Sequence, residues 1–223
     1  VYYSVPINDW DTSLITDMSS LFSYKSSFNS DISGWDVSNV TNMEGMFSNA
    51  NNFNQPLNDW DVSSVTKMRS MFFGARNFNQ SLNDWDVSIV ENMRNMFDSA
   101  TAFNGDISSW TLRSSNLSMQ DMFKGASLFN VDITTWDTSG VTNMQEMFKN
   151  AIVFDQDIQY WKTNHSSFNN MFSGANAMLT RGFPTTPSSS THFNQPFPIT
   201  QANIQTAVDL WVSNQSSATD IYG

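Results

Sequence analysis

The 223-residue sequence contains no cysteine, so disulfide bonds are excluded and the cysteine count says nothing about the compartment. It has only 2 histidines, His165 and His192, and the sequence places no further ligands beside them for a metal site. No run of 18 apolar residues occurs, which predicts no direct membrane insertion. The chain also lacks an initiating methionine and a signal peptide, which suggests a processed or excised piece.

Charged residues are scarce as well, at 14% of the chain. They comprise 10 basic and 21 acidic side chains, a net charge of −11, which argues against nucleic acid as a partner. The sequence shows no nucleophile motif, phosphate-binding loop or dinucleotide fingerprint. We therefore predict a protein that is not an enzyme, with no catalytic residue, no cofactor and no metal site.

What the chain does contain is a repeat. Tryptophans recur every 25 residues with a single step of 26, at Trp10, Trp35, Trp60, Trp85, Trp110, Trp136 and Trp161. Between them, the same apolar residue types return at the same positions, and stacking the copies turns each position into a column. The columns contain Val40, Met43, Met46, Phe47, Ala50 and Phe53 together with their counterparts in the other copies. Such a period indicates a solenoid whose coils bury their apolar faces against one another.

Within one copy, apolar residues from Val40 to Ala50 recur at steps of three and four, the period of a short helix. Thr41 with Glu44, and Thr142 with Gln145, have the spacing of a capping box. The stretch from Phe53 to Trp60 suits a short extended segment. The sequence therefore predicts an α/β solenoid, similar to leucine-rich repeats, of about seven 25-residue coils, each with a short parallel strand and a short helix, plus a C-terminal helix.

The pattern Trp-Asp-Val-Ser-x-Val-Thr-x-Met-x-x-Met-Phe-x-x-Ala-x-x-Phe-Asn, written out from Trp35 to Asn54, carries a family resemblance. It resembles the bacterial surface-protein repeat of about 26 residues, a relative of the BspA-like leucine-rich repeats. The match covers residues 3–178. The resemblance implies an extracellular, often membrane-anchored, cell-surface protein used in attachment or protein contacts, and it does not imply an enzyme.

The copies divide the chain into a repeat solenoid (1–178), an inserted Pro/Ser/Thr loop (179–192), a last partial coil (193–199), and an amphipathic helix with a tail (200–223). In the fifth copy, residues 111–117 depart from the pattern and add one residue, which predicts a local bulge. Thr200 can cap a helix from Gln201 to about Ser213.

That C-terminal helix suggests how copies of the chain meet. Proteins of the resembled type have such a helix before their first repeat, so joining Gly223 to a new Val1 would restore their order. We therefore predict head-to-tail self-association, as tandem units or as a filament. The predicted interface contains the helix stripe Ile204, Ala207, Val208 and Trp211, and the N-terminal residues Tyr2, Tyr3, Val5 and Ile7. The alternative is that the helix folds back and caps its own last coil.

A second hypothesis is a cell-surface binding module that recognises a protein or a glycan. Its reading surface would consist of the variable positions Asn39, Ser64, Ile89 and Gly140. Four Asn-x-Ser/Thr sequons are candidates for N-glycosylation in a secreted protein, at Asn39, Asn116, Asn164 and Asn214.

Three polar columns need a structural and a functional interpretation. The acidic column (Asp11, Asp36, Asp61, Asp86, Asp137) suits Asx turns and, less well, a calcium ladder. The asparagine column (Asn29, Asn54, Asn79, Asn104, Asn130, Asn194, with Asp155 substituting) suits a ladder of buried amides that satisfies the backbone of adjacent coils. A second acidic column (Asp31, Asp106, Asp132, Asp157) specifies no acid/base pair.

Overall fold

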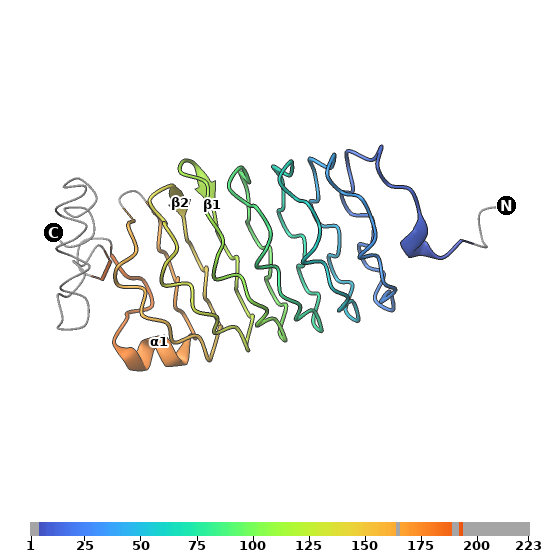
Figure 1. Ribbon diagram of the computed structural model, residues 1–223. Helices are drawn as coiled ribbons and strands as arrows, with labels where there is room; N and C mark the ends of the chain where they lie inside the picture. The colour runs from blue at the N-terminus through green and yellow to red at the C-terminus, as the bar shows by residue number, and fades with distance from the viewer. Residues whose placement is uncertain (1–4, 164–165, 189–191, 194–223) are drawn as a thin grey trace, which may run out of the picture.

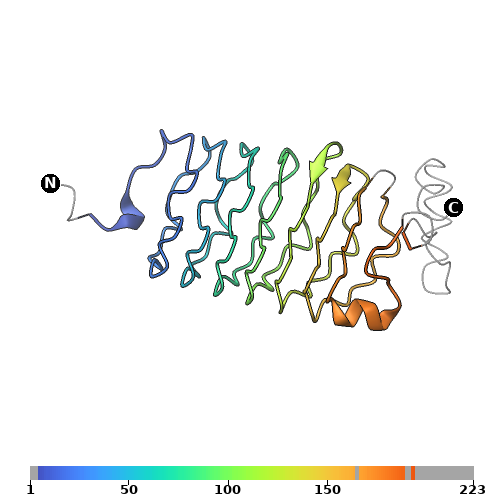
Figure 2. The same ribbon diagram turned by 180° about the vertical axis from the view of Figure 1, so that it is seen from behind.

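The computed structural model describes residues 5–163, 166–188 and 192–193. Its described elements are the 3-10 helix η1 (Ile7–Asp9), the strands β1 (Leu117–Ser118) and β2 (Val141–Asn143), and the helix α1 (Asn176–Arg181). Figures 1 and 2 show successive coils stacked along one axis. The predicted C-terminal helix at 200–223 lies outside the described residues.

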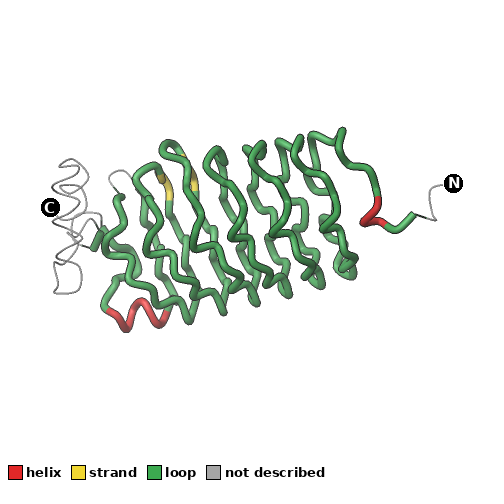
Figure 3. Tube along the Cα trace, in the orientation of Figure 1, coloured by secondary structure: helices red, strands yellow, loops and turns green. Residues whose placement is uncertain are grey.

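The predicted helix in each coil is wrong. Figure 3 shows that the described coils consist almost entirely of loops and turns, and α1 follows the last of them. Along the stretch equivalent to Met43–Ala50, amides alternate between two kinds of acceptor. One set closes a turn within the coil, as when Met71 N donates to Met68 O over 3.2 Å. The other set donates to the next coil, as when Phe72 N donates to Met96 O over 2.9 Å.

Four of the inter-coil bonds form a ladder between neighbouring coils, and others donate back to the preceding coil, as when Thr66 N donates to Thr41 O. In the coil of Trp60, the amides of Met68, Ser70, Phe72 and Gly74 donate to the carbonyls of Asn92, Arg94, Met96 and Asp98 over 2.8 to 3.2 Å. In a helix, these amides would donate to the carbonyls four residues earlier in the same segment. The chain instead uses them to bind each coil to the next.

Two positions in each coil make this backbone path possible, because both lie in the left-handed region with φ between 53° and 75°. The first position is occupied by Ser20, Gly45, Ser70, Asn95, Asp121, Glu146 and Asn170. The second is occupied by Tyr24, Asn49, Gly74, Ser99, Gly125, Asn150 and Gly174. Nine of these fourteen residues are Gly, Asn or Asp, the types that tolerate this region best. The three- and four-residue spacing thus arises from linked turns.

The predicted capping box is wrong for the same reason. Thr41 Oγ1 donates to Thr16 O of the preceding coil over 3.3 Å. Glu44 N donates instead to the side chain of Asn42, over 3.1 Å. The same Asx geometry recurs where Gln145 N donates to Asn143 Oδ1 over 2.9 Å. The amide of Glu44, which the capping box was expected to bond to Thr41, is therefore satisfied by an Asx turn from Asn42.

The extended pairing also falls elsewhere than predicted. Parallel bridges join neighbouring coils at the column of Asn42, and β1 and β2 pair in parallel in the same part of the coil. No strand is present from Phe53 to Trp60, where one was predicted. The bulge expected in the fifth copy is confirmed, since the register shifts between Leu117 and Ser118.

The apolar columns form the core, as predicted. Phe47, Phe72 and Phe97 are fully buried, and their rings stack from coil to coil at centroid distances of 5.4 and 5.5 Å. Each buried tryptophan also has a partner for its indole N–H: Trp85 Nε1 donates to Leu57 O over 2.8 Å. The ring stacking and the indole bonds therefore repeat at the same spacing from coil to coil.

The asparagine column forms the predicted ladder, on the outside of the stack. Asn79 N donates to Asn54 Oδ1 over 2.9 Å, and Asn104 N donates to Asn79 Oδ1 over 2.7 Å. The side chains are exposed or half-buried, so the prediction of buried amides is wrong. Each amide oxygen bridges two coils at a point where the backbone ladder has no rung.

Beyond the last regular coil, α1 covers Asn176–Arg181, so the predicted loop at 179–192 begins inside a helix. Gly182 ends the helix in the left-handed region, with φ 108°, and its N–H donates to Leu179 O and Met178 O. The chain then runs back across the end of the stack.

The left-handed positions predict a clear substitution effect. Gly74→Val places a β-branched residue at φ +64°, with its Cβ 2.5 Å from Asn49 Oδ1. We expect a loss of about 2 kcal/mol or more in the free energy of unfolding, measured by denaturant titration. Gly125→Asn is the matched control, because its nearest neighbour lies at 3.6 Å and Asn tolerates this region. Equal losses for both variants would contradict the turn geometry.

The asparagine ladder predicts a second pair of variants. Asn79→Ala removes the acceptor of Asn104 N and should lower the free energy of unfolding by about 1 kcal/mol. Asn79→Asp keeps an acceptor oxygen at this position and should lose less than half as much. A loss for Asn79→Asp as large as that for Asn79→Ala would show that the oxygen does not act as the bridge.

Candidate interaction surface at the N-terminal end

Exposed apolar side chains gather at the N-terminal end of the stack. Ten large apolar residues are exposed in the described part of the chain, and six of them lie within residues 5–24. These six are Val5, Trp10, Leu14, Ile15, Leu21 and Tyr24. Trp10 is 48% exposed, whereas Trp35 and Trp60, in the same column, are 5% and 3% exposed. In the first coil (residues 10–34), Trp10, Ile15 and Leu21 are therefore exposed at positions that the following coils bury.

The backbone of the first coil is open on the same face. The carbonyls of Asn42, Glu44, Met46 and Ser48 each accept an N–H from the coil before them. Their counterparts in the first coil are Asp17, Ser19, Leu21 and Ser23, and none of these carbonyls accepts a bond within the part of the chain that the structure describes. We call this row of four carbonyls the acceptor edge. An edge of unpaired backbone groups is a template for pairing.

The structure places two of the eight predicted interface residues. Val5 is 49% exposed and lines a shallow hollow with Trp10, while Ile7 is half-buried against the core. The other six lie outside the described residues: Tyr2, Tyr3, Ile204, Ala207, Val208 and Trp211. Sequence reasoning missed Leu14 and Leu21. Leu21 was read only as a member of the Met46 column, which is buried in the later coils, whereas Leu14 lies in the column of Asn39, Ser64 and Ile89, which are exposed or half-buried.

The first acidic column forms Asx turns, as expected. Asp36 Oδ1 accepts the N–H of Ser38 over 3.0 Å and its hydroxyl over 2.7 Å, and these bonds lower the pKa of Asp36. Asp86 makes the same turn with Ser88, and its pKa is lowered by the Ser88 hydroxyl and then the Ser88 N–H. The second acidic column repeats the motif, which the sequence analysis did not foresee: Ser33 N donates to Asp31 Oδ1 over 2.9 Å.

No group of three or more His, Cys, Asp or Glu side chains among the described residues could hold a metal ion. His192 lies within the described chain, where its Nδ1 accepts the N–H of Ser188 over 3.2 Å. His165 lies outside it.

A strip of charged side chains crosses the middle coils on the turn face. Lys124 bridges Glu146 at 2.7 Å and Asp121 at 3.3 Å, and Lys149 also pairs with Glu146, at 3.1 Å. Lys124 lowers the pKa of Glu146, and Glu146 raises the pKa of Lys124. Asp98 is 7% exposed, and burial raises its pKa despite bonds from Ser99 and Asn95. Of these three ion pairs, Lys124–Glu146 joins neighbouring coils, and the other two lie within one coil.

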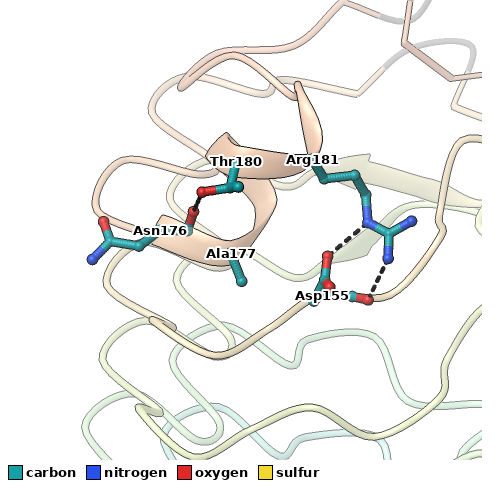
Figure 4. A pocket seen from close by; sticks show the side chains of 5 residues that line it. All are labelled: Asp155, Asn176, Ala177, Thr180 and Arg181. Carbon is teal, nitrogen blue, oxygen red and sulfur yellow. Dashed lines mark hydrogen bonds and ion pairs between the residues drawn. The ribbon is translucent and has the colours of Figure 1, made fainter.

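Near the C-terminal end, Arg181 joins α1 to an earlier coil. Figure 4 shows its guanidinium aimed at Asp155, with Nε donating to Asp155 Oδ1 over 2.7 Å and Nη2 to Asp155 O over 2.9 Å. The hollow beside this pair is open and shallow. The pair therefore anchors the helix on the stack.

The four variable positions predicted to form a reading surface differ in their exposure. Asn39 and Ile89 are exposed, Ser64 is half-buried and Gly140 is buried, so Gly140 cannot contribute to such a surface. Among the sequons, Asn39 and Asn116 are exposed, whereas Asn164 and Asn214 lie outside the described residues. Glycosylation stays a prediction.

Comparison with known proteins identifies the repeat. The family model described as Mycoplasma protein of unknown function, DUF285, matches residues 2–110, 80–182 and 113–209. The chain belongs to the DUF285 family. Its three overlapping matches show that the family model recurs along this chain as a tandem repeat. No curated protein and no solved structure matches the chain.

Membership in the DUF285 family supports the repeat and leaves the specific relationship to BspA-like leucine-rich repeats as a prediction. Among the described residues of this DUF285 chain, no helix has the length and hydropathy needed to cross a membrane.

The environments of Asp98 and Asp86 predict opposite effects of pH on stability. The raised pKa of Asp98 adds stability that is complete below its unfolded pKa, about 3.9, and is lost as pH rises through the folded value. Asp98→Asn should therefore gain stability relative to the parent as pH rises from 3 to 7. The lowered pKa of Asp86 adds stability above the unfolded value that is lost as pH falls.

Asp86→Asn is thus the control for Asp98→Asn, since its loss relative to the parent should grow over the same pH range. Denaturant titrations of both variants and the parent at several pH values give these differences. The same sign of pH dependence in both variants would contradict the assigned environments.

Proposed function

We propose that this chain is a non-enzymatic, extracellular structural or adhesive repeat protein that assembles end to end. In this proposal, the apolar stripe of residues 200–213 in one copy covers the first coil of the next copy. The copies are either tandem units of one polypeptide or subunits of a filament. The BspA-like surface-repeat resemblance supports the cell-surface location and the adhesive role.

The observation that carries the proposal is the cluster of six exposed apolar side chains on residues 5–24. Burying a side chain of this size contributes roughly 1.5–3 kcal/mol before the costs of association. A solenoid end that exposes its core requires a cap for solubility. An amphipathic helix suits this face because its apolar stripe can cover the side chains of the first coil.

Charge opposes this association at low ionic strength. Each copy carries a net charge of −11, and the first coil bears Asp11 and Asp17. Salt screens repulsion of this kind over about 8 Å at physiological ionic strength. Assembly driven by apolar burial should therefore strengthen as salt rises, whereas assembly through ion pairs would weaken.

The test compares Trp211→Ala with the parent protein by negative-stain electron microscopy and sedimentation velocity. We expect the variant to keep the folded stack, judged by circular dichroism, and to form shorter assemblies. Leu14→Asp, at a side chain that is 89% exposed on the first coil, should shorten them too.

Leu128→Ala is the matched control, because this side chain is 55% exposed on the flank of a middle coil. Its assemblies should keep the parent length. Unchanged assembly in both Trp211→Ala and Leu14→Asp would overturn the proposal. Binding of a protein or a glycan by strictly monomeric protein would favour the binding module instead.

A further inference from the structure

The two ends of the stack differ in how their backbone ladders terminate. At the N-terminal end, the carbonyls of the acceptor edge accept no bond from any described residue. At the other end, the last coil (residues 161–175) carries the donor counterparts, the amides of Phe168, Asn170, Phe172 and Gly174. Two of these amides find partners in the residues that follow α1: Asn170 N donates to Thr186 Oγ1 over 2.9 Å, and Phe172 N donates to Thr185 O over 3.0 Å.

Residues 183–187, which we call the cap segment, thus occupy the place of a further coil. In the coil before, Glu146 N and Phe148 N make the equivalent bonds to Asn169 O and Met171 O, each over 2.9 to 3.0 Å. In place of these two carbonyls, the cap segment provides the Thr186 hydroxyl and the Thr185 carbonyl as acceptors. Pro187 within it is buried and has no N–H that could extend the ladder.

The cap segment also terminates the phenylalanine column. Along the stack, neighbouring rings are nearly parallel: Phe97 and Phe123 differ by 1°, and Phe148 and Phe172 by 8°. Phe183 instead meets Phe172 edge-on, at 69° and a centroid distance of 5.4 Å. A parallel ring could continue the stack, whereas an edge-on ring leaves no parallel face for a further coil.

Without the cap segment, the two ends would match. The four amides of the last coil face in the direction of the acceptor edge of a second copy, at the spacing that the ladder repeats between coils. The acidic column supports this pairing, because it runs from Asp11 to Asp137 and then changes sign at Lys162 in the last coil. A first coil stacked there would bring Asp11 next to Lys162.

We propose that the two ends of the stack are complementary surfaces for two copies of this chain, and that the cap segment keeps the last coil of one copy from stacking directly on the first coil of another. The proposal shares with the proposed function only the first coil as a docking surface. Contacts between copies are then made through residues beyond the cap segment, and direct coil-on-coil growth is blocked. The anchor of α1, through Arg181 and Asp155, holds the cap segment in position.

The test is a full-length variant with Phe183→Gly, Thr185→Gly, Thr186→Gly and Pro187→Gly, which removes the ring, the hydroxyl acceptor and the buried proline. We expect linear assemblies with a weight-average mass about twofold or more above that of the parent, by light scattering and electron microscopy. Adding Leu21→Asp, at a side chain that is 47% exposed beside the acceptor edge, should remove this gain and bring the mass to the parent value or below it, because Leu21 also belongs to the apolar cluster of the proposed function.

Equal masses for the parent and the glycine variant would overturn the proposal, and so would growth that ignores Leu21→Asp, since that indicates unspecific aggregation. If the glycine variant loses the folded signal in circular dichroism, the pair Phe183→Ala and Thr186→Val repeats the test with less disruption. Trp211→Ala separates the two proposals. Its effect in the parent tests the helix contact, and growth of the glycine variant carrying Trp211→Ala tests the cap segment alone.

Discussion

The structure depends on the backbone bonds that join each coil to the next. Four amides of one coil donate to four carbonyls of the following coil, and the pattern repeats along the stack. Regular helix would use these amides internally, so the ladder requires linked turns with two left-handed residues per coil. The stacked phenylalanines, the tryptophan N–H bonds and the asparagine ladder all share the spacing that the ladder sets. Stability in such a stack is a sum of neighbour contacts, so its ends matter most.

The four-rung ladder has all its donors on one side, so its two ends differ. The acceptor edge and six apolar side chains are exposed at the N-terminal end of the stack, whereas Thr185, Thr186 and Phe183 cover the last coil. This asymmetry gives any end-to-end assembly a direction. It also distinguishes the exposed N-terminal end from the last coil, which other residues of the same chain cover.

The repeat, the buried columns and the Asx turns at residues such as Asp36 were predictable from the sequence, because period and residue type determine them directly. The linked turns were not predictable from the apolar spacing, because they place apolar residues at the same three- and four-residue steps as a helix does. The Gly, Asn and Asp residues at Gly74, Asn95 and Asp121 carried the missing signal, since they recur where the chain is left-handed. The open face of the first coil could be inferred, but the closure by Thr185 and Thr186 could not, since it depends on where α1 returns the chain.

Hydrogen exchange, resolved amide by amide, tests the ladder and its closure most directly. The account predicts slow exchange for Phe97 and Phe123 in the middle of the stack, and protection of Asn170 and Phe172 under the cap segment. Phe168 and Gly174, for which no acceptor is found among the described residues, should exchange faster than these two neighbours. Equal exchange of all four last-coil amides would contradict the account.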